Sequence, residues 1–377
     1  MFSIDTKTII KLLKAYEWGS VWLTLNQVDE HFDELVTDQK PQFRALQAML
    51  LAGWWQDPGS AKALLVVFPR IISDPLTHFA VSYAWMAIGD NQKIKYYRQH
   101  APTQQPSWMK DWLAIEIYGR SLAFDKQITH VIKCYKNPEN HDWVRVALLQ
   151  SLEHKKAQLD SLISWLDRLS PTPKSDPLTI ALAIRAGVLN WQNCSTPDAS
   201  QPLLLSLYAY YLYITKQANE SMIALDQLVC TGFIDLNKLN QWLSLSCSFP
   251  QGLGSLLNRV EFALSIAPKS ITIQGTIASY GLVYSWLTRN YENAYILVKN
   301  YNQFRATKRT EENGNAQVFF RYVLSLCVAW QHNQQIYAHV SGATLSWEKI
   351  QIPNFTFIQV SKTNRKSSIF NQTFQFV

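Results

Sequence analysis

Apolar side chains recur at steps of three and four residues along most of the chain, which is the spacing of an amphipathic α-helix. The pattern runs through residues 9–16, 46–54, 80–87, 203–214 and 282–286. Pro and Gly interrupt it at short intervals. Most prolines stand where a helix begins or has just ended, because the missing amide hydrogen costs least there. The pattern predicts helices of about 10 to 16 residues joined by short turns.

The predicted second helices of successive helical hairpins recur at a nearly constant step. When one small or apolar residue is marked near the middle of each, the first steps are 33, 34 and 34 residues. After a gap of 61 residues, the steps are 34 and 37. The marked residues are Ala61, Ile94, Ile128, Leu162, Ile223, Leu257 and Ala294. A step near 34 residues is the length of a tetratricopeptide helix–turn–helix unit.

Individual residues also resemble the tetratricopeptide pattern. Ala84-Trp85 is followed by the turn Gly89-Asp90 and closed by Ala101-Pro102, with Ile94 where the family usually has Ala. Residues 290–294 and 209–224 are similar to a turn with its flanking helices. The resemblance covers roughly residues 40–334. It implies an all-α, right-handed α-solenoid over residues 1–334, in which stacked hairpins share one core and present a concave surface. Proline- and serine-rich stretches at 170–177 and 193–202 interrupt the repeat.

The last part of the chain, residues 335–377, alternates apolar and polar side chains. Residues 336–340, 355–360 and 373–377 each have the period of a β-strand. About 40 residues of strand cannot easily build a core alone. We therefore predict a short β-containing tail that docks on the last helices or is a remnant of a larger domain.

The flanks of the first predicted strand resemble the opening of a hydrolase domain of the SGNH type. In residues 336–347, Gly342 occupies the position of the family's nucleophilic serine, and Ala343 that of the adjacent histidine. Acyl transfer needs an activated nucleophile and a base. The resemblance therefore implies a domain start that lacks its catalytic residues, and we expect no enzymatic activity.

Composition and charge narrow the class of protein. The 377 residues are 47% hydrophobic and 13% aromatic, which excludes wholesale disorder. The formal net charge is +7 and the pI is near 9.0. The cations are scattered in groups of two or three, at 93–98, 155–156, 305–309 and 362–366. A solvated face explains such groups best, although a phosphate-binding groove stays an alternative.

Neither metal nor cofactor binding is expected from the motifs. The five cysteines stand singly, without the Cys-x-x-Cys or Cys/His spacing of a zinc site. No two histidines have the four-residue spacing of a helical metal pair with a supporting carboxylate, and no glycine-rich phosphate motif occurs. The longest apolar run, 203–214, has 12 residues, whereas a membrane span needs about 20. With no signal-peptide pattern at residues 1–14, we expect a cytoplasmic chain with buried free thiols.

Adjacent aromatic residues suggest a binding groove. Neighbours on a helix point about 100° apart, so the two members of a pair cannot both face one side. We therefore expect one member of each pair to line a groove, where it would stack on peptide side chains, sugars or bases. Simple packing with large residues is the alternative. The candidate groove residues are Trp55, Tyr97, Tyr211, Tyr284 and Arg305.

These observations predict a non-catalytic binding or scaffold protein that presents a concave helical-repeat surface to a protein partner. Two alternatives stay open. One is a nucleic-acid binder of the pentatricopeptide type, suggested by the positive net charge. The other is an accessory module of a carbohydrate- or acyl-modifying enzyme, suggested by the hydrolase-like flanks at 336–347. The sequence leaves the oligomeric state open.

Overall fold

A computed structural model describes residues 4–121, 123–153, 177–185, 189–248 and 255–270, parts of 273–281, and four two-residue strands between 339 and 356. Contacts divide the chain into two compact units, Met1–Asp235 (unit 1) and Leu236–Val377 (unit 2). The predicted boundary between residues 334 and 335 lies outside the described residues.

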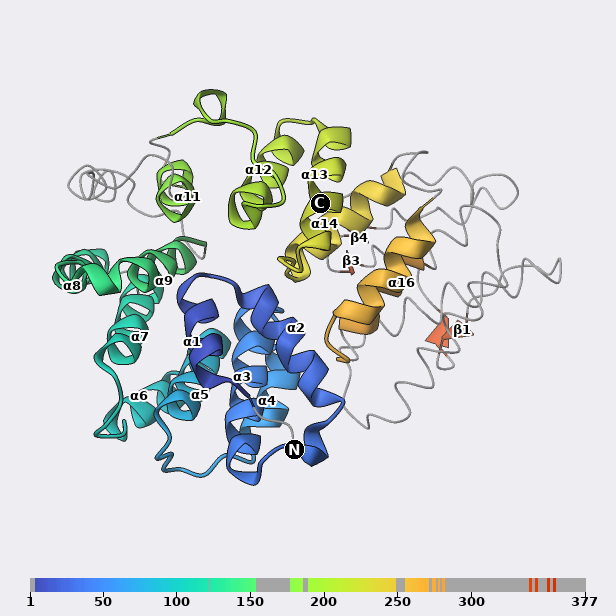
Figure 1. The fold of residues 1–377 in the computed structure, drawn as a ribbon. Coiled ribbons are helices and arrows are strands. Elements are labelled where there is room, and N and C mark those ends of the chain that lie inside the picture. Colours follow the sequence, from blue (N-terminus) through green and yellow to red (C-terminus); the bar gives the residue numbers. More distant parts are fainter. Residues whose placement is uncertain are drawn as a thin grey trace. The chain divides into compact units, whose positions relative to one another are not determined.

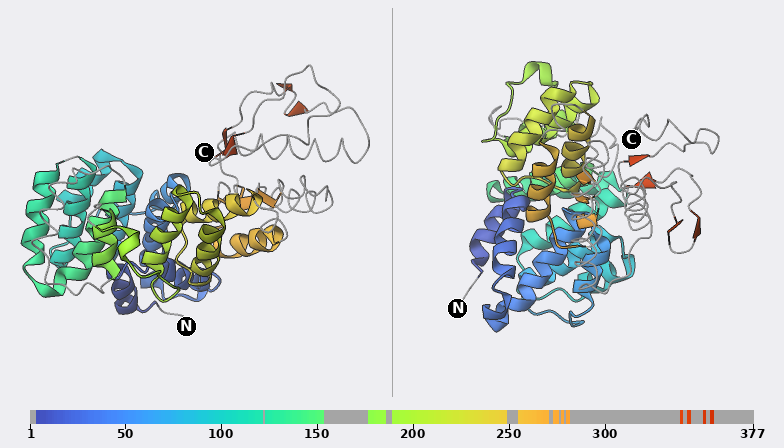
Figure 2. Two further views of the ribbon diagram at one scale, coloured as in Figure 1. Left: turned by 90° about the horizontal axis from the view of Figure 1, so that it is seen from above. Right: turned by 90° about the vertical axis from the view of Figure 1, so that its right-hand side faces the viewer.

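The described part of unit 1 is built of helices, which confirms the all-α prediction at this level (Figure 1). Two further views show the same helices (Figure 2). The α-helices are α1 (Thr6–Lys14), α2 (Trp18–Asp29), α3 (Lys40–Gly53), α4 (Pro58–Leu65), α5 (Pro75–Ile88), α6 (Asn91–Gln99), α7 (Ser107–Arg120), α8 (Phe124–Tyr135), α9 (His141–Glu153), α11 (Pro177–Arg185), α12 (Pro202–Ile214) and α13 (Ala218–Cys230). Short 3-10 turns are η1 (Phe32–Glu34), η2 (Thr37–Gln39), η3 (Pro138–Asn140) and η4 (Trp191–Asn193).

Unit 2 has two longer described helices, α14 (Leu236–Ser248) and α16 (Leu256–Ile266). Its strands form two antiparallel pairs, β1 (His339–Val340) with β2 (Ala343–Thr344), and β3 (Gln351–Ile352) with β4 (Phe355–Thr356). β1 and β4 fall within two of the three predicted strands, but each comprises only two residues. The third predicted strand, 373–377, lies outside the described residues. The β-containing tail therefore stays a prediction.

Helix ends follow the expected capping chemistry. Pro75 is the first residue of α5, and the Asp74 carboxylate accepts a hydrogen bond from the backbone N–H of Thr77 at 2.8 Å. α5 ends at Gly89, whose φ of +87° is accessible to glycine at little cost. Asp90 then caps α6 by accepting from the backbone N–H of Lys93 at 3.0 Å. The predicted Gly-Asp turn between two helices is thus present.

The helices of unit 1 differ in how they are buried. α3 and α5 are central, because every residue of 45–52 and of 76–86 is buried. α8 is peripheral and buries one stripe, Gln127, Val131 and Cys134. Within unit 1, α3 packs on α5, α5 on α7 and α7 on α9. The peripheral helices α4, α6 and α8 each pack on the helix before them. Each of the repeat markers Ala61, Ile94 and Ile128 lies in one of these peripheral helices.

The segment after α13, residues 231–235, contacts the first helices of the chain. The indole N–H of Trp54 donates to the carbonyl oxygen of Ile234 at 2.9 Å, across 180 residues of sequence. The Phe233 ring lies 5.2 Å from Trp54 and 5.7 Å from Tyr16, between ring centroids. We call Tyr16, Trp54, Phe233 and Ile234 the closing cluster. Because all of them are buried, the cluster joins the two ends of unit 1 through one aromatic core.

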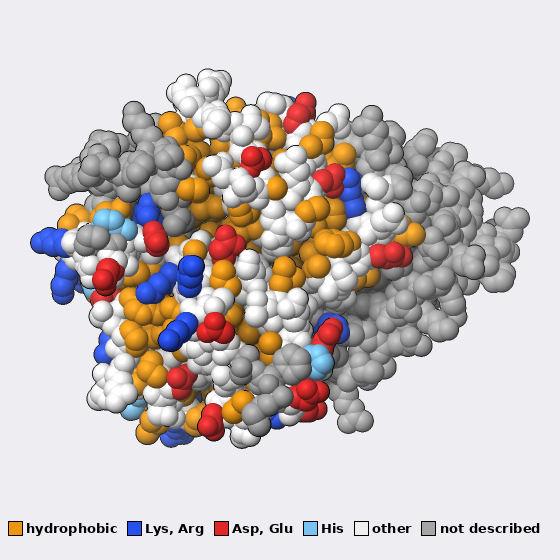
Figure 3. Space-filling model, in the orientation of Figure 1, with side chains coloured by type: hydrophobic (Ala, Val, Ile, Leu, Met, Phe, Trp, Pro, Cys, Tyr) orange, Lys and Arg blue, Asp and Glu red, His pale blue; other side chains and the backbone are white. Residues whose placement is uncertain are grey.

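Charged side chains of both signs lie among one another on the face drawn in Figure 3. Such mixing is typical of a solvated face. Of the predicted basic groups, Lys93, Lys95 and Arg98 are exposed on α6. Within the described part of the chain, every helix is too short or too polar to cross a bilayer.

Candidate functional sites

Three aromatic rings meet between η4 and α12. Tyr208 and Tyr211 are three residues apart on α12, so both project from one side of the helix. Their ring centroids are 6.3 Å apart with a stacked orientation. Trp191 of η4 lies 5.1 Å from Tyr208 and 6.2 Å from Tyr211. The three rings form a small aromatic platform that belongs to unit 1.

An open pocket of about 440 Å³ lies beside this platform. Tyr210 and Ile214 form part of its wall although they are 52% and 56% exposed, which is unusual for large apolar side chains. None of the nine described residues that line the pocket is Lys, Arg, Asp or Glu. The lining is Ile184, Leu189, Asn190, Trp191, Gln192, Leu207, Tyr210, Tyr211 and Ile214. The pocket thus offers ring faces and amide groups without a formal charge.

The structure distributes the candidate groove residues unevenly. Tyr211 lines the aromatic pocket. Trp55 is only 1% exposed and packs on Trp22, and Tyr97 is 4% exposed. Neither Trp55 nor Tyr97 therefore offers surface to a ligand in this structure. Tyr284 and Arg305 lie outside the described residues.

Burial on all sides explains why the argument from adjacent aromatics does not apply to Trp54 and Trp55. An adjacent aromatic lines a groove only where the helix has one face in the groove and the opposite face in the core. These residues stand at the end of α3, which is surrounded by other helices, so both indoles are buried although they point in different directions. This condition holds better on α12, where Tyr210 is exposed and Tyr211 is half-buried.

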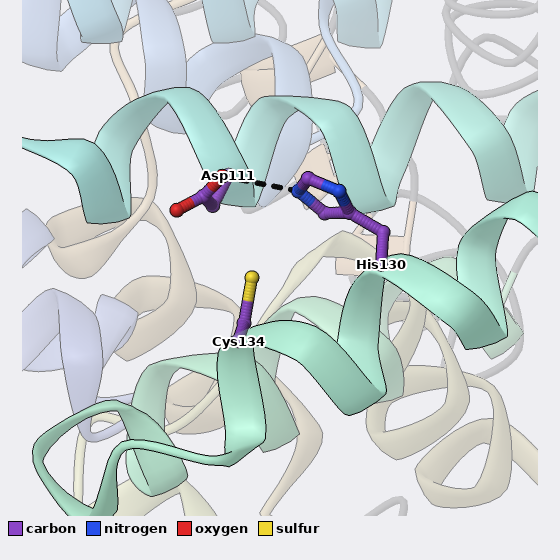
Figure 4. A group of neighbouring side chains, drawn as sticks. All are labelled: Asp111, His130 and Cys134. Carbon is purple, nitrogen blue, oxygen red and sulfur yellow. Dashed lines mark hydrogen bonds and ion pairs between the residues drawn. The ribbon is translucent and has the colours of Figure 1, made fainter.

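A second group of side chains joins α7 to α8 (Figure 4). Asp111 of α7 faces His130 and Cys134, which are one turn apart on α8. The His130 Nε2 and Asp111 Oδ1 atoms are 3.1 Å apart. One ligand atom from each of the three side chains lies within 4.8 Å of the other two. The rings of Tyr118 and His130 are in a T-shaped arrangement, with their centroids 5.9 Å apart.

The three side chains of this group differ in how deeply they are buried. The Cys134 side chain belongs to the buried stripe of α8 and is 7% exposed, whereas His130 and Asp111 are 22% and 31% exposed. Burial, first, and then the negative charge of Asp111 raise the pKa of the Cys134 thiol to about 11. A nucleophilic cysteine needs a lowered pKa. The three residues therefore do not form an activated Cys-His-Asp triad, because the thiol is held in its protonated form.

The sequence contains a signal for this group that the motif search did not use. The Cys/His spacings of zinc motifs were considered and judged absent, but His130 and Cys134 form a mixed pair four residues apart. Two such side chains lie on one face of a helix. Asp111 could not be found in this way, because only the packing of α7 on α8 brings it to the pair.

Comparison with protein-family models, curated protein sequences and solved structures gives no match to this chain.

Proposed function

We propose that this protein is a non-catalytic binding protein, built as an α-solenoid of tetratricopeptide-like hairpins, that holds a segment of a partner protein. The aromatic pocket beside Trp191 and Tyr211 is the observation that carries the proposal. Partly exposed rings around a preformed hollow are typical of recognition sites, because they offer a large contact area with little loss of side-chain freedom.

The chemistry of the pocket favours a protein segment over a nucleic acid. Nucleic-acid affinity rests largely on Lys and Arg contacts to phosphates, and none of the described lining residues is cationic. The amide groups of Asn190 and Gln192 lie beside the rings and offer hydrogen bonds to a peptide backbone. An extended, proline-containing segment suits these features, since aromatic-lined grooves bind the polyproline II conformation.

The test measures binding of fluorescein-labelled peptides to the full chain by fluorescence anisotropy. The panel comprises a neutral proline-rich peptide, an acidic peptide without proline and a single-stranded RNA. We expect the proline-rich peptide to bind best, with an affinity that changes little with salt. Replacing Tyr211 by alanine removes one ring from the platform, and should weaken binding by about 2 kcal/mol, or roughly 30-fold.

Tyr213→Ala is the matched control, because Tyr213 is on the same helix but does not belong to the described pocket lining. It should leave the affinity unchanged. Preferred binding of RNA with a steep salt dependence would refute the proposal and support the nucleic-acid alternative. Equal losses for Tyr211→Ala and Tyr213→Ala would place the binding surface elsewhere on the chain.

A further inference from the structure

We propose that Asp111, His130 and Cys134 form a Zn²⁺-binding site that links α7 to α8. This site is distinct from the aromatic pocket and does not depend on the function proposed for it. The three side chains supply one oxygen, one nitrogen and one sulfur, and these are the three ligand atoms that zinc uses in proteins.

The spacing of the three side chains suits a tetrahedral ion. Ligand distances of about 2.0 to 2.3 Å place neighbouring ligand atoms roughly 3.3 to 3.6 Å apart. His130 Nε2 and Asp111 Oδ1 are 3.1 Å apart, which is close to that edge length. The Cys134 Sγ atom lies within 4.8 Å of a ligand atom of each of the other two side chains. A change of about 1 Å, within reach of side-chain rotation, brings the sulfur into range.

The charges of the group also suit a divalent cation. Binding of Zn²⁺ releases the thiol proton of Cys134 to solvent. The resulting thiolate and the Asp111 carboxylate carry two negative charges, which Zn²⁺ balances, with the neutral imidazole as third ligand. This balance matters because Cys134 is buried, where an uncompensated charge is costly. A sulfur and an imidazole ligand favour Zn²⁺ or Co²⁺ over Mg²⁺ and Ca²⁺, which prefer oxygen.

Access to the site comes from the Asp111 side. The carboxylate is 31% exposed and the imidazole 22% exposed, so an ion meets these two groups before it reaches the buried sulfur. Three protein ligands leave the fourth position of a tetrahedral ion to water. The bound ion would add a link between two helices that the hydrogen bond between His130 and Asp111 already joins at this point.

Cobalt spectroscopy tests the proposal directly. The full chain is reduced, stripped of metal with a chelator and titrated with Co²⁺. A thiolate-to-cobalt charge-transfer band should grow to one ion per chain, together with the visible bands of four-coordinate cobalt, and Zn²⁺ should abolish both. Cys134→Ser should remove the charge-transfer band, whereas Cys194→Ser and Cys230→Ser, at thiols outside the group, should retain it.

His130→Gln and Asp111→Asn provide a second test at partly exposed positions, where both variants should fold. Each should weaken Co²⁺ binding at least about tenfold, since even the loss of an outer-shell partner has such an effect. Far-ultraviolet circular dichroism of each metal-free variant checks the fold. The absence of a charge-transfer band in the wild type, or its persistence in Cys134→Ser, would overturn the proposal.

Discussion

Replacing Gly19 by alanine places a methyl group inside the contact between α2 and the segment 231–235. A Cβ atom built on Gly19 lies 2.1 Å from the carbonyl oxygen of Gly232 and 2.9 Å from its carbonyl carbon. Both atoms belong to the backbone and cannot rotate away as a side chain would. The helix and the segment must therefore separate by about 1 Å to restore normal contact distances.

The size of the effect follows from three contributions. Overpacking of a tight contact costs about 1 to 3 kcal/mol. Separation of the two backbones also weakens the nearby hydrogen bond from Trp54 to Ile234, which contributes about 1 kcal/mol. Alanine in place of glycine within a helix stabilises by about 1 kcal/mol in the opposite direction. The free energy of unfolding should therefore fall by roughly 1 to 3 kcal/mol.

Urea unfolding of the full chain, followed by tryptophan fluorescence, measures this loss. A decrease of about 2 kcal/mol lowers the midpoint by roughly 0.7 to 1 M when m is about 2 to 3 kcal/mol/M. Gly59→Ala is the matched control. Gly59 is exposed in the first turn of α4, and the nearest atom to its added Cβ is Asp57 Oδ1 at 3.5 Å. This control should leave the midpoint unchanged or raise it slightly.

The reasoning is refuted if Gly19→Ala unfolds at the same urea concentration as the wild type, or at a higher one. That result would mean that α2 and the segment 231–235 are not in contact in solution. Equal destabilisation by Gly19→Ala and Gly59→Ala would point to a general effect of the substitution and would also contradict the structure.

Three further predictions concern stability. Trp54→Phe leaves the Ile234 carbonyl without its indole donor and should cost about 1 to 3 kcal/mol in urea unfolding; an unchanged midpoint would contradict the contact. Burial lowers the pKa of His78, which is 1% exposed, so its imidazole binds a proton more readily in the unfolded chain than in the folded one. The free energy of unfolding should therefore fall as the pH drops below the unfolded pKa of about 6.5. His78→Gln, whose amide can still donate to the Tyr97 carbonyl, should make this dependence on pH less steep. An equally steep dependence in the variant and the wild type would refute the prediction. Asp74→Ala removes the cap of α5 and should cost about 1 kcal/mol and speed amide exchange in its first turn, whereas unchanged exchange would contradict it.

The helical class and several helix ends were predictable because they depend on local chemistry. The three- to four-residue period, the Asp74-Pro75 start and the Gly89-Asp90 turn each specify the backbone within a few residues. Tertiary packing is needed only to stabilise such features. The marked positions Ala61, Ile94 and Ile128 fall within helices for the same reason, since the local apolar period predicts each of α4, α6 and α8.

The sites depended on contacts that the local pattern does not contain. Tyr211 could be predicted from its neighbours in the sequence. Its partner in the pocket, Trp191, is 20 residues away along the chain and contacts it only because of the tertiary fold. Trp55 has the same local pattern as Tyr211 and is nevertheless buried, because α3 is covered on all sides. Asp111 is a similar case, since the packing of α7 on α8 brings it to His130.

The closing cluster limits how unit 1 can be divided. In an open repeat array each hairpin touches only its neighbours, so terminal hairpins can be removed or added one at a time. Here Tyr16 and Trp54 share a core with Phe233. Truncation before residue 231 would uncover these N-terminal rings, and removal of α1 to α3 would uncover Phe233. Either fragment would expose apolar surface and tend to aggregate. We therefore expect unit 1 to fold and stay soluble only when it is expressed whole.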